Sequence, residues 1–526
     1  MDPTTVNRRR WWTLGVLNLS LLMIFMDNTI LNVALPTLAR DLHATGGQLQ
    51  WMVDSYVLVF AGLLLPAGAL GDRFGRRGVF NAGLVVFGLG SIAAMLADSA
   101  TTLIATRSVM GAGAALIMPA TLSILTNVFT DPRERSKAIG SWAMVGGLGV
   151  ALGPVAGGWL LEHFAWSSVF LVNLPAVVVV LIATAVFVPT SKDPATPPLD
   201  IVGAVLSIVG LGSLVWAIIE GGEQGWTYRP TIVGFAVAVA VLAAFAAWEI
   251  SSEHPMLDLS FFANRRFTAA SLAVMLGYFA LFGTLFLLSQ LLQFVLGYSA
   301  LDAGIRLLPF ALVMAVFSPI SVKLVHRLGT KVVVVVGMTS LSGGLLWLAS
   351  NGIHDRYGAY LPAMIVMGAG VALTWAPTTE AIMGSLPPSK AGVGSAINDT
   401  VREVGGALGV AVLGSLVAGR YSSAMTDASS ALPGPIADAT RDSLGGAVTV
   451  AQQLGGQAGQ SLVSAGRAAF LDGFGLALTV AAFVALLGAG LAAAWLPARA
   501  GAVDEPIDKV GPEFERLVDL DGVAAI

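Results

Sequence analysis

The chain contains 526 residues, of which 56% are hydrophobic and 11% are charged, and its formal net charge is −4. Soluble domains have about 45 to 50% apolar and about 25% charged residues, so this composition predicts a membrane protein. The charges form no basic stripe, which argues against nucleic acid as a partner, and the absence of cysteine excludes disulfides, thiol catalysis and thiolate metal sites.

Fourteen apolar segments are long enough to cross a bilayer as helices, which takes about 20 residues each. They lie at 11–36, 51–70, 79–97, 102–126, 138–160, 166–189, 200–219, 230–249, 268–295, 303–325, 331–349, 358–383, 393–419 and 470–496. The sequence therefore predicts an all-α polytopic membrane protein with an N-terminal six-helix bundle (1–190), two inserted transmembrane helices with linkers (191–267) and a C-terminal six-helix bundle (268–497). Within the last unit, 420–469 is expected to be a long extracellular loop with amphipathic helices near 436–468, and 498–526 is expected to be a cytoplasmic tail.

The distribution of Lys and Arg predicts the orientation, because cytoplasmic loops carry the excess of these residues. If the N-terminus is inside, 19 of the 28 Lys and Arg residues fall in inner segments and 6 in outer segments. This split predicts a multi-pass protein of the cell inner (cytoplasmic) membrane with both termini cytoplasmic.

The first span carries a carboxylate, in the stretch NLSLLMIFMDNTILNVALP at 18–36. An ionised Asp at the bilayer centre costs about 2.5 to 3.5 kcal/mol, so Asp27 is expected to face the protein interior or an aqueous path. Asp54 near the outer end of the second span and Arg107 in the fourth fall at a similar depth. We expect Asp27 and Asp54 to bind protons or attract cations; the alternatives are a structural ion pair at Asp27 and an interfacial position for Asp54.

A loop motif occurs twice, as GALGDRFGRR at 68–77 and as VKLVHRLGTK at 322–331, which indicates an internal repeat of six spans. The second copy has His326 in place of the acid of the first. We expect the first copy to be a gating loop whose charges pair across the two bundles; the alternative is that its Arg residues only fix topology. Its candidate residues are Gly68, Asp72, Arg73, Gly75, Arg76 and Arg77.

The fifth span carries GVALGPVAGG, in which small residues four apart allow close helix packing and a proline bends the helix. Its candidate residues are Gly149, Gly153, Pro154, Gly157 and Gly158. A generic packing face is the competing interpretation.

The thirteenth span carries three charges, Asp399, Arg402 and Glu403. An ion pair between Asp399 and Arg402, three residues apart on a helix, would leave Glu403 as the freer acid. We expect Glu403, and after it Asp399, to take part in proton or substrate coupling.

Aromatic side chains within the spans are candidates for a substrate cavity, since cation–π contacts contribute about 0.5 to 2 kcal/mol to the binding of lipophilic cations. Each residue taken alone could instead pack in the core or face lipid. The candidates are Tyr56, Phe60, Trp142, Tyr278, Phe282, Phe286 and Trp375, with Gln290 and Gln293 as further polar contacts.

These motifs together resemble the major facilitator superfamily. GALGDRFGRR is similar to its loop motif, GVALGPVAGG to the fifth-span motif of its exporters, and LIATRSVMGAGAA around Arg107 to its fourth-span motif, although Met110 stands where that motif usually has Gln. MDNTILNVALP and WMVDSYVLVF resemble the first two spans of the fourteen-helix drug:proton antiporters of the QacA and LfrA type, where acids match Asp27 and Asp54.

The resemblance implies two major-facilitator bundles and a proton-coupled antiporter that exports lipophilic, often cationic, drugs, antiseptics and dyes by alternating access. It implies no cofactor other than the proton gradient, and as partners small-molecule drugs, protons and the lipid bilayer around a monomer. A dedicated exporter of one endogenous antibiotic or metabolite remains an alternative. An intramembrane hydrolase that uses Asp27 and Asp54 is the alternative of a different class. The sequence has no phosphate-binding loop for ATP and no metal-binding spacing of His residues.

Overall fold

The computed structural model describes residues 3–129, 131–191, 200–253, 255, 257–352, 356–385, 391–430 and 432–498, and within these ranges the chain forms helices and no strand. The expected all-α fold is therefore confirmed. Of the expected tail at 498–526, only Ala498 lies within the described residues.

The helices follow the expected spans closely and are grouped by the three units that the sequence predicts. The N-terminal bundle consists of α1 (Pro3–Asp41), α2 (Gly46–Phe74), α3 (Arg76–Met95), α4 (Ala100–Val128), α5 (Pro132–His163), α6 (Ser168–Leu171) and α7 (Asn173–Phe187). The inserted helices are α8 (Ile201–Gln224) and α9 (Arg229–Ser251). The C-terminal bundle consists of η1 (Leu259–Ala263), α10 (Arg265–Gln290), η2 (Leu291–Val295), α11 (Ala300–Leu328), α12 (Thr330–Ala349), α13 (Tyr357–Met383), α14 (Ala391–Ser429) and α17 (Gly456–Trp495), with α15 (Gly434–Asp442) and α16 (Leu444–Leu454) between its last two helices.

Twelve helices are long and apolar enough to cross a membrane among the residues that the structure describes. They match all the predicted spans except the second and fifth, which correspond to α2 and α5. Both are helices of full spanning length, 29 and 32 residues, and each contains residues whose side chains lie outside the described part of the chain. The predicted count of fourteen is therefore not confirmed, although all fourteen segments are helical.

The two copies of the loop motif adopt the same turn. Gly75 ends α2 with φ = 109°, and Gly329 ends α11 with φ = 86°. A side chain with a Cβ rarely adopts these positive values, so glycine is required at both turns. The next helix starts directly after each turn, as expected for a repeated unit.

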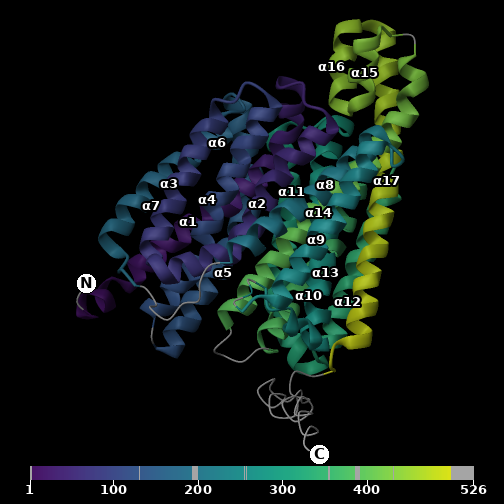
Figure 1. Cartoon of the computed structure of the whole chain (residues 1–526). Helices are drawn as coiled ribbons and strands as arrows, with labels where there is room; N and C mark the ends of the chain where they lie inside the picture. The colour runs from purple at the N-terminus through teal and green to yellow at the C-terminus, as the bar shows by residue number, and fades with distance from the viewer. Residues whose placement is uncertain are drawn as a thin grey trace, which may run out of the picture.

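The segment 420–469 is helical over most of its length, and its extracellular location stays a prediction. α14 continues to Ser429, α17 begins at Gly456, and α15 and α16 lie between them as the expected amphipathic pair. The hydroxyl of Tyr421 donates to the carbonyls of Thr440 and Ser443 and so fixes α15 and α16 onto α14. In Figure 1 these helices form the end of the molecule opposite the start of α1 and the end of α17. Following the predicted orientation, we call this the outer end.

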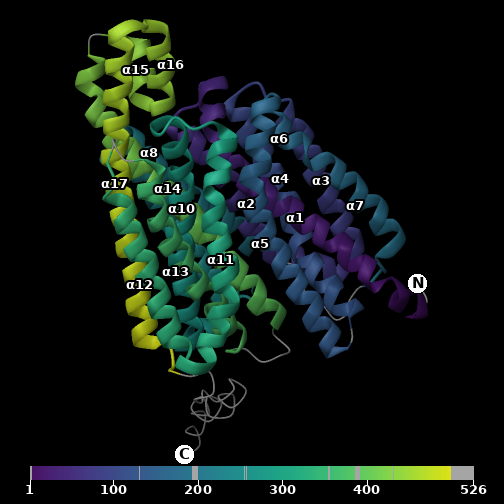
Figure 2. The same cartoon turned by 180° about the vertical axis from the view of Figure 1, so that it is seen from behind.

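The two bundles meet at the outer end. Gln50 of α2 and Ser415 of α14 form a buried side-chain hydrogen bond of 3.3 Å, and the Gln293 amide donates to the Val33 carbonyl of α1 at 2.9 Å. The Ser289 hydroxyl donates to the Asn32 carbonyl. Figures 1 and 2 show the bundles tilting apart toward the opposite, inner end. The structure is therefore an outer-closed conformation.

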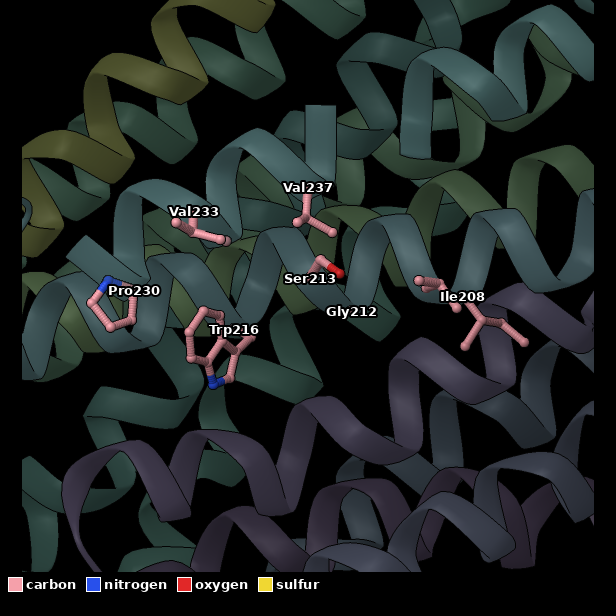
Figure 3. A pocket seen from close by; sticks show the side chains of 9 residues that line it. Ile208, Gly212, Ser213, Trp216, Pro230, Val233 and Val237 are labelled. Carbon is pink, nitrogen blue, oxygen red and sulfur yellow. The ribbon is translucent and has the colours of Figure 1, made fainter. Parts of the chain in front are cut away.

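The inserted helices pack against the contact region of the bundles through α8. A Cβ on Gly62 of α2 would lie 3.2 Å from Cδ1 of Ile208, and one on Gly222 would lie 2.8 Å from the Ser415 Cα. On their exposed side α8 and α9 enclose a groove of about 490 Å³ (Figure 3). Its lining is apolar except for the Ser213 hydroxyl and the Trp216 indole N–H, and it suits contact with lipid. The lining residues are Ile208, Val209, Gly212, Ser213, Trp216, Pro230, Val233, Gly234 and Val237.

Candidate functional site

Asp27 and Arg107 form a buried ion pair in the N-terminal bundle. Oδ2 of Asp27 lies 2.6 Å from Nη1 of Arg107, and the side chains are 2% and 0% exposed. The other carboxylate oxygen accepts a hydrogen bond from Nδ2 of Asn173 at 2.7 Å. Asn173 Nδ2 also lies 3.1 Å from the hydroxyl of Ser91. Both oxygens of Asp27 are thus occupied, the arrangement that a buried charge requires.

Arg107 is also held by groups of α2. Its Nε donates to the Met52 carbonyl at 3.2 Å, and its guanidinium lies over the Tyr56 ring at 4.3 Å from the centroid. Only Nη2 of this side chain is buried without a partner. The pair therefore joins α1, α2, α4 and α7, and the predicted proximity of Asp27 to Arg107 is present. The geometry favours the structural ion pair that the sequence left as the alternative for Asp27.

Asp54 lies on a different face of α2. It follows Gln50 by one helical turn, so it shares the face that meets α14, whereas Met52 and Tyr56 face Arg107. The residue is fully buried, and neither carboxylate oxygen has a hydrogen-bond partner among the described residues. A depth near the membrane interface stays the alternative prediction for Asp54, and the expected cluster of Asp27, Asp54 and Arg107 is divided between two faces of α2.

The charges of α14 form a second cluster, which belongs to the C-terminal bundle. Arg402 lies 3.4 Å from Oδ1 of Asp399 and donates to the Thr379 hydroxyl of α13 at 2.9 Å. The expected ion pair between Asp399 and Arg402 is therefore present. Glu403 is half-buried and lies within electrostatic range of Tyr56 across the interface between the bundles. It is the acid of this cluster without an ion pair among the described residues.

Three of the candidate aromatic residues gather beside this second cluster. The Tyr278 ring of α10 stacks on Trp375 of α13 at 4.3 Å and on Phe282 at 5.6 Å between centroids. Arg402 lies over the same Tyr278 ring at 5.4 Å. The C-terminal bundle therefore presents an aromatic platform next to two acids.

The other aromatic candidates lie elsewhere. Tyr56 stacks on Phe60 at 6.0 Å, on the side of Arg107. Trp142 is tied to α4 by a hydrogen bond from Nε1 to the Thr121 hydroxyl at 3.1 Å. Phe286 is buried near the outer end, where it lines a small pocket with Gln50 and Gln290. These residues do not join the Tyr278 platform.

The glycines of the fifth-span motif pack α5 against two other helices. A Cβ on Gly149 would lie 2.7 Å from the Phe25 Cβ, one on Gly153 would lie 3.0 Å from the Met26 carbonyl, and one on Gly157 would lie 3.2 Å from Ile30. All three contacts are with α1. Gly158 instead meets α11 of the other bundle, where a Cβ would lie 2.6 Å from the Ala300 carbonyl.

Pro154 belongs to the same contact between bundles, since its carbonyl lies directly against Gly304 of α11. The motif thus provides a packing face toward α1 and a close approach to α11 at the outer end. Both interpretations of the motif, an exporter motif and a generic packing face, are compatible with this position.

The gating-loop residues bond within their own bundle in this conformation. Arg77 donates to the Val188 and Ala185 carbonyls, both at 3.2 Å, at the C-terminal end of α7, where a positive charge is favourable. Arg76 donates to the Ser123 carbonyl of α4 at 3.5 Å, and Arg73 is exposed beside Phe74. Gly68 lies on α2 near Pro119, and the side chain of Asp72 lies outside the described part. The expected pairing across the bundles remains a prediction for the opposite conformation.

Sequence reasoning missed the polar groups that complete the two clusters. Asn173 stands in the predicted sixth span as an isolated amide, and such a residue within lipid indicates a buried partner. Ser91 and Thr379 carry no comparable signal, because serine and threonine hydroxyls are usually satisfied by their own helix.

Comparison with known proteins places this geometry in context. The family model of the Major Facilitator Superfamily matches residues 17–410. The chain is 36% identical over 490 residues to the multidrug efflux pump LfrA of Mycolicibacterium smegmatis, covering 93% of this chain and 97% of that protein. It is also 36% identical over 482 residues to the methyl viologen resistance protein SmvA of Salmonella typhimurium, covering 91% and 97%.

Among solved structures, the chain is similar in fold to a bacterial homolog of the human lysosomal transporter Spinster in an inward-facing and occupied conformation. The TM-score is 0.66 with 16% sequence identity, over 92% of this chain and 96% of that one.

Proposed function

The chain belongs to the major facilitator superfamily, a family of transporters rather than enzymes, and from this premise we propose that it exports lipophilic, often cationic, drugs across the cytoplasmic membrane in exchange for protons. The naming of the relatives LfrA and SmvA as a multidrug efflux pump and a methyl viologen resistance protein supports a drug as the exported substrate. The intramembrane hydrolase is set aside, because the family is one of transporters.

The observation that carries the proton coupling is the position of Asp54. Its carboxyl group is fully buried on the face of α2 that meets α14, and both oxygens are without a hydrogen-bond partner among the described residues. Burying an unpaired charge is far less favourable than burying a neutral polar group. In our proposal the outer end closes when Asp54 carries a proton and opens when it is charged.

Glu403 is the second carboxylate of the proposed mechanism. It lies about 18 Å along α14 from the inner start at Ala391, at 1.5 Å per residue, whereas Asp54 lies about 12 Å from the outer start of α2. A cation arriving from the cytoplasm would meet Glu403 and the Tyr278 platform, and would replace the proton of Glu403. In each cycle both acids take up a proton from outside while the outer end is open and lose it to the inside while the outer end is closed, so protons move inward as the cation moves outward.

In this mechanism Asp27 does not carry the proton. Its ion pair with Arg107 and its hydrogen bond from Asn173 support a role in holding α1, α4 and α7 together while the bundle moves as one body. The driving force is sufficient, since about 2.3 kcal/mol is available per charge moved across 100 mV.

Ethidium efflux from cells that make the protein tests this proposal. We expect efflux in the wild type to stop when an uncoupler collapses the proton gradient, and Asp54→Asn to lose efflux at equal membrane abundance. Arg356→Gln is the matched control, because Arg356 is exposed near the start of α13, away from both clusters. Efflux that continues with the uncoupler would overturn proton coupling, and full activity of Asp54→Asn would remove Asp54 from the mechanism.

A further inference from the structure

The aromatic platform of the C-terminal bundle is already covered by a cation. Arg402 places its guanidinium carbon 5.4 Å from the centre of the Tyr278 ring, which is stacked on Trp375 at 4.3 Å. Cation–π attraction extends to about 6 Å from a ring centroid. The ring that should attract a cationic substrate is therefore in contact with a positive charge of the protein itself.

Arg402 is held loosely at this place. Its distance to Asp399, 3.4 Å, is long for a charge-assisted hydrogen bond, which is usually about 2.7 to 2.9 Å. The Thr379 hydroxyl accepts its one short hydrogen bond, at 2.9 Å. Its Nε is buried without a partner among the described residues, and the side chain is 25% exposed. Few contacts would be lost if this guanidinium moved.

Arg107 provides the contrast within the same molecule. It also lies over a tyrosine, Tyr56, but its ion pair with Asp27 is 2.6 Å long, and both side chains are almost fully buried. The Met52 carbonyl accepts a further hydrogen bond from it. One arginine–tyrosine pair is fixed in the core, and the other stands partly exposed beside two acids.

We propose that Arg402 is a resident cation of the substrate site, and that cationic substrates bind by displacing its guanidinium from the Tyr278 ring. This inference rests on the proposed function as an exporter of lipophilic cations. Asp399 and Glu403 lie on the same helix, three residues before and one residue after Arg402, and can pair with the displaced guanidinium. Arg402 thereby selects among substrates, without being an obligatory contact for them.

The chemical class of cation follows from this competition. A guanidinium is weakly hydrated and stacks well on aromatic rings. Only a cation that gains more from the aromatic faces than it loses in hydration can replace it. Large ions with delocalised or shielded charge, such as phosphonium, phenanthridinium and bipyridinium compounds, meet this condition. Small hydrated cations do not, and neutral drugs gain nothing from displacing Arg402.

Equilibrium binding to the purified full-length protein tests the proposal, with radiolabelled tetraphenylphosphonium as the cation and chloramphenicol as the neutral compound. In Arg402→Gln we expect the affinity for tetraphenylphosphonium to rise about tenfold, which is about 1.4 kcal/mol. The affinity for chloramphenicol should stay within about twofold. Tyr278→Leu in the Arg402→Gln background should cancel the gain, as a double-mutant cycle requires for two residues that act through one contact.

The outcomes separate this inference from the proposed function. Equal tetraphenylphosphonium affinity in the wild type and Arg402→Gln, or a parallel loss of both ligands, would overturn the resident cation and leave export intact. A wild type that binds neither compound would contradict the proposed function itself. If Arg402→Gln does not fold, the single variant Tyr278→Leu decides. Because Arg402 already covers the Tyr278 ring, we expect this variant to weaken tetraphenylphosphonium binding by about threefold or less. A loss above thirtyfold, as for removal of an uncovered ring, would overturn the inference.

Discussion

Replacing Asp27 by asparagine tests whether this carboxylate has a structural role or carries the proton. The pair with Arg107 has a distance of 2.6 Å, and the two side chains are 2% and 0% exposed, so the substitution leaves an uncompensated buried charge. Breaking a buried pair in this way destabilises a protein by about 3 to 5 kcal/mol. We therefore expect Asp27→Asn to lower the unfolding temperature clearly in detergent, measured by size-exclusion retention after heating.

The double variant Asp27→Asn/Arg107→Met is the matched control. Because replacing both members of a buried pair by neutral groups is often close to neutral, it should recover most of the lost stability. Asp27→Asn protein that remains folded at low temperature should still release protons when substrate is added. An Asp27→Asn protein with wild-type thermal stability and no proton release would refute the reasoning, since Asp27 would then carry the proton.

Two further predictions concern the contact between the bundles at the outer end. Gly158→Ala would place a Cβ 2.6 Å from the Ala300 carbonyl and so push α5 away from α11. We expect a single cysteine introduced at the outer end to be labelled faster in this variant than in Gly343→Ala, whose Cβ would meet nothing within 4 Å. Equal labelling of the two variants would show that α5 and α11 need not touch. Gln50→Ala removes the hydrogen bond to Ser415, worth about 0.5 to 1.5 kcal/mol, and should raise the outward-open population roughly 2- to 13-fold in the same assay. A Gln50→Ala protein that is labelled more slowly than the wild type would contradict the assignment of this contact to the closed state.

Much of the fold could be predicted from the sequence, because spans in lipid are long apolar runs and cannot be anything but helices. The loop motif repeated around Gly75 and Gly329 indicated an internal repeat, and both copies form the same kind of turn in the structure. The helices within 420–469 were harder to predict from the sequence, because a segment rich in small residues shows only a weak helical periodicity of apolar side chains. That α14 and α17 extend into this segment depends on their packing with α15 and α16, which hydropathy does not report.

The candidate site could be predicted only as a set of residues. Their depth in the bilayer follows from helical rise, and it correctly suggested that Asp27 and Arg107 are close. Which face of α2 carries Asp54, and which partner Asp27 takes, depend on the rotation of each helix about its axis. Two residues along a helix rotate the side chain by about 200°, so Gln50 and Asp54 lie on the face of α2 opposite that of Met52 and Tyr56. Sequence alone therefore placed three charges together that the structure divides into a pair and an unpaired acid.

The central claim is that a proton on Asp54 allows the outer end to close, and labelling of a single cysteine at this end tests it most directly. The chain has no natural cysteine, so Leu49→Cys, a 2% exposed position between the bundles, reports opening without other thiols. Labelling rates are divided by those of Asp98→Cys, an exposed outer position, to remove the pH dependence of the thiol reaction. We expect the normalised rate to fall as the external pH is lowered in the wild type, and to be low at every pH in Asp54→Asn. The same pH dependence in Asp54→Asn as in the wild type would contradict the account.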